Sequence, residues 1–160
     1  MDHPRVSVCT RTWCRDASLK MTIGSFLAQS FEDFELLVAD DSSPNDTALT
    51  VGLCSFGPRL RHLRLLQTLG PAGNWNRGIT EACGKYIKAP RRDDLIAVVD
   101  LKRQVTVFDA PPDVLPIFSS RNLIGKSNPP LSVKGRLWEE GHVATNASRR
   151  RRICSGTKLP

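Results

Sequence analysis

The feature that most constrains the fold of this 160-residue chain is a short apolar run that ends in two adjacent acids. Residues 34–39 read FELLVA, with Glu35 as the one polar residue, and Asp40 and Asp41 follow directly. A sharply bounded run of this length is typical of a strand buried on both faces, as in a parallel sheet. The next residues, 42–46, form a turn cluster. We therefore expect a central strand that delivers two carboxylates to a loop at its carboxyl end.

Strand and helix patterns alternate along the chain on both sides of this run. Strands are predicted over residues 6–10, 34–39, 61–66, 85–89 and 114–118. Helices are predicted from a cap at Asp16 or Ser18 to Leu27, from a cap at Asn45 or Asp46 to Cys54, and over about 74–82 and 98–109. Apolar residues share one stripe of the first helix, namely Leu19, Ile23, Phe26 and Leu27. Successive strand–helix–strand units predict an α/β fold with a doubly wound, mostly parallel, Rossmann-like sheet.

Two acid pairs close predicted strands, Asp40 with Asp41 and Asp93 with Asp94. Ligands of open α/β sheets bind at the carboxyl ends of the strands, and we expect the four carboxylates on neighbouring strand ends. Hard oxygen ligands of this kind suit Mg²⁺ or Mn²⁺ bridging a diphosphate. The alternative for either pair is structural, because acidic residues also cap and begin helices.

The order of four sequence motifs resembles that of the inverting family 2 glycosyltransferases of the GT-A fold. The motifs are VSVCTRTW, SFLAQSFEDFELLVADDSSPNDT, GPAGNWNRGITEACGKYIK and RRDDL, and the resemblance covers about residues 4–118. It implies a partner, a nucleoside-diphosphate sugar, and a reaction that moves the sugar to an acceptor hydroxyl with inversion. The acceptor is not indicated.

The resemblance also implies roles for particular residues. Thr12 and Trp13 of the first loop, with Asp41 at the end of the second strand, are expected to hold the nucleotide. The loop and helix around Asn74 and Arg77 are expected beside the donor diphosphate. The remaining acid pair, Asp93 and Asp94, matches the DXD-type site for a divalent cation, Mg²⁺ or Mn²⁺.

Several positions depart from the pattern of that family. Arg11 stands in place of its usual proline and Cys14 in place of its usual asparagine, and Arg91 and Arg92 occupy the beginning of the DXD motif. Two arginines there are expected to weaken metal binding or to reach the diphosphate themselves. After residue 118 no match to the family's acceptor-binding half is expected, so the catalytic base is unknown and the domain is interpreted as truncated.

The net charge of +7 is confined to the end of the chain. Residues 1–120 hold fourteen Lys and Arg against fourteen Asp and Glu, whereas residues 121–160 hold nine against two. We therefore expect a neutral nucleotide-sugar-binding domain over residues 1–120, with a basic, poorly ordered tail over 121–160, and no specific nucleic-acid partner. No apolar run approaches the ~20 residues of a membrane span. Five scattered cysteines indicate reduced thiols and a cytoplasmic location.

Three functions stay open on these grounds. The first is a glycosyltransferase domain, and the second is an inactive remnant that binds nucleotide without turnover. The third is a receiver-like signalling domain, which is disfavoured because its acid pair would follow the first strand. In this chain, Arg11, Thr12 and Trp13 occupy that loop.

Overall fold

The structure, a computed structural model, describes residues 3–14, 16–54, 57–91, 93–110, 121–124 and 130–134. The chain divides between Lys102 and Arg103 into two compact units. The boundary between the units lies inside a helix, whereas the sequence analysis placed the domain boundary at residue 120.

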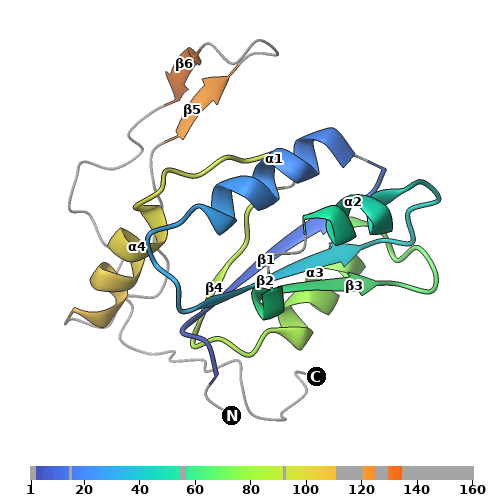
Figure 1. Cartoon of the computed structure of the whole chain (residues 1–160), viewed down its shortest axis with the longest axis horizontal. Coiled ribbons are helices and arrows are strands. Elements are labelled where there is room, and N and C mark those ends of the chain that lie inside the picture. The colour runs from blue at the N-terminus through green and yellow to red at the C-terminus, as the bar shows by residue number, and fades with distance from the viewer. Residues whose placement is uncertain are drawn as a thin grey trace. The chain divides into compact units, whose positions relative to one another are not determined.

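The first unit is built on a sheet of four parallel strands (Figure 1). These are β1 (Val6–Thr12), β2 (Phe34–Asp40), β3 (Leu60–Arg64) and β4 (Tyr86–Lys88), in the spatial order β3-β2-β1-β4. The register of β1 on β2 runs from Val6 beside Phe34 to Thr12 beside Asp40. The predicted doubly wound, mostly parallel α/β sheet is confirmed.

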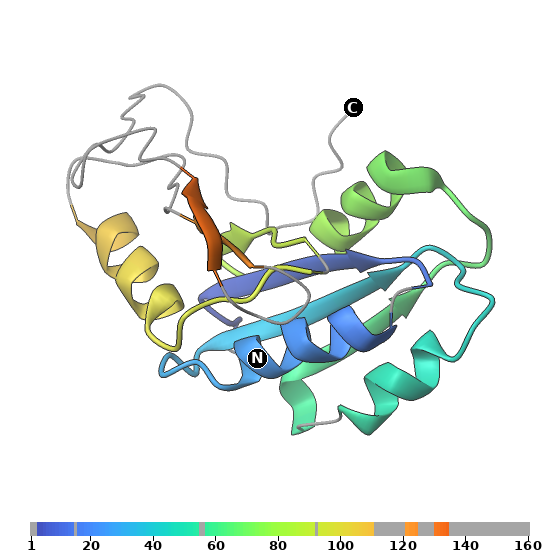
Figure 2. The same cartoon turned by 90° about the horizontal axis from the view of Figure 1, so that it is seen from above.

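Helices cover both faces of this sheet. They are α1 (Asp16–Leu27), α2 (Thr47–Leu53) and α3 (Gly70–Glu81). A short 3-10 turn, η1 (Gly57–Arg59), precedes β3 in the chain, and α4 (Asp100–Asp109) follows β4 in the chain and contains the boundary between the units. Figure 2 shows α1 and α2 on one side of the sheet and α3 on the other. Strand order therefore reverses between β1 and β4, and such a switch point is where open α/β sheets bind ligands.

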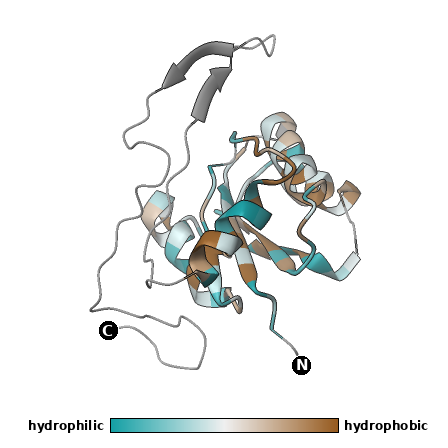
Figure 3. Cartoon of the chain, turned by 90° about the vertical axis from the view of Figure 1, so that its left-hand side faces the viewer, coloured by the Kyte–Doolittle hydropathy of each residue, from teal (hydrophilic) through white to brown (hydrophobic). Residues whose placement is uncertain are grey.

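Burial in the core follows the sequence pattern closely. All seven residues of β2 are buried, as expected for the inner strand of a sheet covered on both faces. Leu19, Ile23 and Phe26 of α1 are also buried. On the α3 side the core continues through Cys9, Leu37 and Ala82. The strands carry much of the apolar colour in Figure 3.

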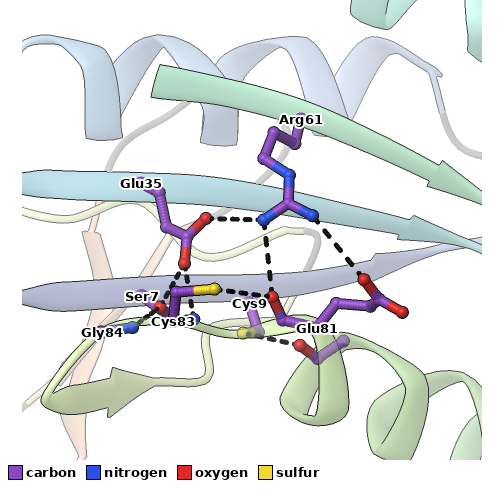
Figure 4. Close-up of polar contacts among 8 residues, drawn as sticks. Ser7, Cys9, Glu35, Arg61, Glu81, Cys83 and Gly84 are labelled. Carbon is purple, nitrogen blue, oxygen red and sulfur yellow. Dashed lines mark hydrogen bonds and ion pairs between the residues drawn. The ribbon is translucent and has the colours of Figure 1, made fainter. Parts of the chain in front are cut away.

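The buried Glu35 anchors the start of β4 to the sheet (Figure 4). Its Oε1 accepts hydrogen bonds from Ser7 Oγ at 2.6 Å and from Cys83 N at 2.8 Å, and Arg61 donates to Oε2 at 3.0 Å. Gly84 N in turn donates to Ser7 Oγ at 2.7 Å. A buried charge is stable where it is paired and its lone pairs are filled, and Glu35 meets both conditions.

Among its described residues, the second unit has an antiparallel strand pair, β5 (Arg121–Ile124) with β6 (Pro130–Lys134). Both strands lie in the segment that the sequence analysis expected to be a poorly ordered tail, residues 121–160. Its prolines obscured the pattern, although proline is tolerated as the first residue of a strand. The strand predicted over residues 114–118 lies outside the described residues, as does the rest of the basic tail.

Candidate nucleotide-binding site

The loops that follow β1 and β2 both contain a residue in the left-handed backbone region. Cys14 has a φ of 51° and Ser42 a φ of 59°. Such conformations destabilise residues other than glycine and concentrate at functional sites. A hydrogen bond from Cys14 N to Ser43 Oγ, 3.1 Å long, joins the two loops. The loops at the carboxyl ends of β1 and β2 are thus hydrogen-bonded to each other.

Asp40 stabilises the loop after β2 from inside the protein. Its carboxylate is fully buried, with Oδ1 accepting a hydrogen bond from Ser43 N at 3.0 Å and His62 Nε2 lying 3.3 Å from Oδ2. An ionised carboxylate has no hydrogen to donate, so Nε2 must carry the proton of this bond. Burial raises the pKa of Asp40, but the hydrogen bonds from His62 and Ser43 outweigh burial and hold the pKa below its ordinary value. Asp40 is therefore a buried anion.

Asp41 caps the helix on the other face of the sheet. Its two oxygens accept hydrogen bonds from Leu69 N at 2.7 Å and Gly70 N at 3.0 Å, at the start of α3. Gly70 has a φ of 74°, which favours glycine at this turn. A carboxylate at a helix amino terminus is stabilised by the free N–H groups and by the helix dipole. This cap explains why α3 begins at Gly70, four residues before the predicted start at Asn74.

Asn74 ties the same helix to both strands. Its Nδ2 donates to Ala39 O at 3.0 Å and to Thr12 O at 3.3 Å. The side chain is buried, and Oδ1 has no hydrogen-bond partner among the described residues. Asn74 therefore lies beneath the loops, against the strand ends.

The residues predicted to contact the donor differ in their exposure. Thr12 is buried, whereas Trp13 is 55% exposed beside it. The Arg11 guanidinium carbon lies 5.9 Å from the centre of the Trp75 ring, at the outer limit of a cation–π contact. Arg77 is half-exposed and forms an ion pair with Glu81 at 2.9 Å. Trp13 and Arg77 are thus accessible to a ligand, whereas the carbonyl of the buried Thr12 accepts hydrogen bonds from Asp41 N and Asn74 Nδ2.

The acid pair after β4 does not lie where the sequence analysis expected it. The four carboxylates are not on neighbouring strand ends, because β1 lies between β2 and β4 in the sheet. The connection through α3 crosses the opposite face, which adds β4 to the far side of β1. Asp93 is exposed, and Asp94 Oδ2 accepts a hydrogen bond from Arg91 N at 2.9 Å.

The two carboxylates of this pair supply only some of the ligands that a divalent cation needs. In the part of the chain that the structure describes, no three His, Cys, Asp or Glu side chains group as a metal site. Two adjacent carboxylates are nevertheless the number that Mg²⁺ commonly takes from protein, with phosphates and water completing its shell. The pair fits a metal that arrives with a diphosphate.

Three residues that brace the site were missed in the sequence analysis. They are Ser43, His62 and Arg64, the last of which donates from Nη2 to Ser43 O at 2.9 Å. His62 and Arg64 belong to the edge strand β3, about twenty residues beyond the loop they support. Only the adjacency of β2 and β3 brings them together, and no local pattern shows that adjacency.

The parallel sheet with helices on both faces is the GT-A fold, which solved structures share with this chain. Of the solved structures, TarS 1-349 of S. aureus aligns with a TM-score of 0.62 and 25% identity, covering 66% of this chain and 32% of that one. A mannosyltransferase of Pyrobaculum calidifontis, in complex with GDP-Man and Mn²⁺, gives 0.62 and 21%, covering 69% and 34%. The second likeness shows the fold alone.

The model of the family Glycosyl transferase family 2 matches residues 7–154, and the chain belongs to this family. The match extends past residue 118, where the sequence analysis had the resemblance end. A β-1,3-glucosyltransferase of Campylobacter jejuni, acting on GalNAc(5)-diNAcBac-PP-undecaprenol, is 34% identical over 93 residues, 57% of this chain and 30% of that protein. A UDP-Glc:α-D-GlcNAc-diphosphoundecaprenol β-1,3-glucosyltransferase of Escherichia coli is 29% identical over 68% of this chain and 42% of that protein.

The chain thus spans between about a third and two fifths of the length of these two curated relatives. None of the helices that the structure describes is both long enough and apolar enough to cross a membrane.

Proposed function

We propose that this chain binds the nucleoside-diphosphate part of a sugar donor at the carboxyl ends of β1 and β2, for transfer of the sugar to an acceptor hydroxyl with inversion. The observation that carries the proposal is the joined pair of loops. They carry the exposed Trp13 and, through the hydrogen bond of Asp41 N to Thr12 O, the buried Asp41, at the edge where sheets of this kind bind ligands. Relatives crystallised with UDP and with UDP-GlcNAc share the fold and support the same ligand class.

Thr12 and Trp13 are proposed to bind the nucleotide together with Asp41. An aromatic face stacks on a base, and a carboxylate accepts a hydrogen bond from a base edge or a ribose hydroxyl. The amino-terminal N–H groups of α3 at Leu69 and Gly70 are already bonded to Asp41. The diphosphate must therefore find its positive partners in side chains, and Arg77 is the residue we assign beside it.

A divalent cation, Mg²⁺ or Mn²⁺, is the cofactor we propose. Asp93 and Asp94 would hold it. When bound it would neutralise the charge that develops on the leaving diphosphate. Arg91, which begins the same turn, adds positive charge of its own, so the site depends less on the metal than a purely acidic one would.

The described cysteines are compatible with a reducing compartment. All four, Cys9, Cys14, Cys54 and Cys83, are free thiols. Disulfides are rare in the cytoplasm, and a cytoplasmic location is part of the proposal.

The direct test is calorimetric titration of the chain with UDP and with GDP, each with and without Mn²⁺. We expect saturable binding of at least one nucleotide with one site per chain. Binding that persists while no sugar is transferred from the matching nucleotide sugar would identify the chain as a donor-binding module. If neither nucleotide binds under either condition, the proposal fails.

A further inference from the structure

One buried side-chain amide holds together the three elements that form the site. Asn74 is 2% exposed in α3, and its Nδ2 donates to Thr12 O on β1 and to Ala39 O on β2. The two acceptors lie on adjacent strands, at the positions where β1 and β2 approach their carboxyl ends. A single NH₂ group thus spans two strands and one helix.

Each acceptor lies directly beside a ligand-binding loop. Thr12 precedes Trp13, and Thr12 O also accepts a hydrogen bond from Asp41 N at 3.2 Å. Ala39 precedes the two acids. The start of α3 binds the Asp41 carboxylate. The helix is therefore bonded to the loops at its first turn and, through Asn74, to the strand ends one turn later. A change in the hydrogen bonds of Asn74 should alter the separation of Trp13 and Asp41.

The remaining oxygen of the amide is informative. Oδ1 of Asn74 is buried and accepts no hydrogen bond from the described residues. An unpartnered buried acceptor destabilises the folded state, a loss that an apolar side chain at this position would avoid. The compensating contribution of the amide is therefore its two donated hydrogen bonds to the strand ends.

We propose that Asn74 is a positioning residue of the nucleotide site, which sets the spacing of Trp13 and Asp41 without touching the nucleotide. This inference rests on the proposed function. It gives Asn74 a different role from the direct contact that the family resemblance implies, because the amide hydrogens are used by the strands and the side chain is closed to solvent.

A matched control is available at the other end of β2. Gln29 is a buried amide, 6% exposed, whose Nε2 donates to Ser25 O at 3.1 Å and Ala97 O at 2.8 Å. Its Oε1 accepts a hydrogen bond from Leu101 N at 3.1 Å. Gln29 thus joins separate backbone segments as Asn74 does, but it precedes the amino end of β2, away from the loops that follow β1 and β2.

The test compares Asn74→Ala, Asn74→Ser and Gln29→Ala by thermal melting and by titration with UDP and GDP. We expect Asn74→Ala to weaken nucleotide binding about ten-fold, and Asn74→Ser, which keeps one donor, to recover part of that loss. Gln29→Ala should lower the melting temperature but leave the affinity within about two-fold of the parent. The order of affinities should be parent, serine, alanine.

A second measurement separates positioning from a general loss of stability. In an Asp41→Asn background, Asn74→Ala should weaken binding by less than in the parent, because the carboxylate that it positions is already gone. Equal losses in the two backgrounds, or affinity unchanged in Asn74→Ala, would overturn the proposal. If Asn74→Ala does not fold, the comparison of Asn74→Ser with the parent decides. Failure of the parent to bind any nucleotide would instead overturn the proposed function.

Discussion

Asp40 and Asp41 are neighbours of identical chemistry that the fold puts to different uses. Asp40 is turned into the protein against Ser43 and His62, whereas Asp41 is turned toward the start of α3. Successive residues of a strand point to opposite faces of the sheet, and this alternation separates them. Asp40 therefore supports the loop after β2 from inside the protein. Asp41 instead places its carboxylate at the start of α3, on the other face of the sheet.

The first prediction concerns Asp41. Asp41→Asn removes the charge at the start of α3 and turns an NH₂ group toward an N–H donor. We expect nucleotide affinity to fall roughly ten- to hundred-fold and the melting temperature to fall as well, since a hydrogen bond to a charged group contributes about 1.5–3 kcal/mol. Calorimetry and thermal melting measure the two effects.

Asp46→Asn is the control for this change. Asp46 is exposed at the start of α2 and makes no capping hydrogen bond with its side chain. The same chemical change there should leave affinity and melting temperature unaltered. Nucleotide affinity equal to the parent in folded Asp41→Asn would remove Asp41 from the binding site.

The second prediction concerns Asp40 and pH. Its pKa is lowered in the folded state from the ordinary value of 3.8, so its stabilising contribution is fully present above that value. The contribution is lost as pH falls through the folded pKa. We expect Asp40→Asn to be less stable than the parent at neutral pH, with the difference shrinking as the pH falls below about 4. Urea unfolding across a pH series tests this, and a constant difference between the two proteins would contradict it.

At the scale of the elements, the junction between α3 and β4 depends on close backbone approach. A Cβ placed on Gly84 would clash with the backbone of Val6 and Ser7, on the strand that β4 joins. The same region holds the hydrogen bonds of Glu35 to Ser7 and Cys83 (Figure 4). Any side chain at residue 84 must therefore push β4 away from β1.

The third prediction compares two glycine substitutions. Gly84→Ala should lower the free energy of unfolding by several kcal/mol, in the range of changes that disturb packed backbone. Gly24→Ala, in α1, meets no atom within 4 Å and should instead raise the free energy of unfolding by about 0.5–1 kcal/mol through helix propensity. Chemical denaturation of the two variants checks the opposite signs. Equal effects would show that Gly84 tolerates a side chain.

Most elements of the first unit could be predicted because their signals are local. The apolar run of β2 and the stripe of Leu19, Ile23 and Phe26 identify a strand and a helix from their own residues. The start of α3 could not be predicted in this way, because its cap is Asp41 on another element. The family resemblance points to Asp41 and Asn74, yet their hydrogen-bond partners depend on tertiary structure.

The same limit explains the misplaced acid pair. The sequence order of the strands indicates that β4 follows β3, but not that it pairs with β1 on the far side of the sheet. The handedness of crossovers leaves both sides of the sheet open to a fourth strand. The structure ends β4 at Lys88, five residues before Asp93, and the strand next to β4 is β1 and not β2.

At the scale of the whole molecule, metal and nucleotide should bind as a coupled pair. Asp93 and Asp94 alone give a cation too few ligands, so phosphate oxygens must complete its shell. Arg91 already supplies positive charge, which should keep the coupling modest.

The fourth prediction measures this coupling. We expect Mn²⁺ to tighten nucleotide binding by about 1 kcal/mol, and nucleotide to tighten Mn²⁺ binding equally, because linkage is reciprocal. Combined Asp93→Ala and Asp94→Ala should erase the coupling and leave metal-free nucleotide binding largely intact. The exposed acidic pair Glu32 and Asp33, at the other end of β2, serves as the matched control. Coupling that survives loss of Asp93 and Asp94 would place the metal elsewhere.

The cap that Asp41 provides for α3 should also couple the folding of this helix to the folding of β2. A helix of twelve residues that contains Gly73 and Gly78 is marginal in water on its own, because nucleation is unfavourable and glycine weakens it. Its first turn becomes stable only when β2 has brought a carboxylate from twenty-eight residues upstream. We therefore expect the helix and the ligand loops to form in one cooperative event. A partly folded intermediate in which α3 has formed before β2 should not accumulate.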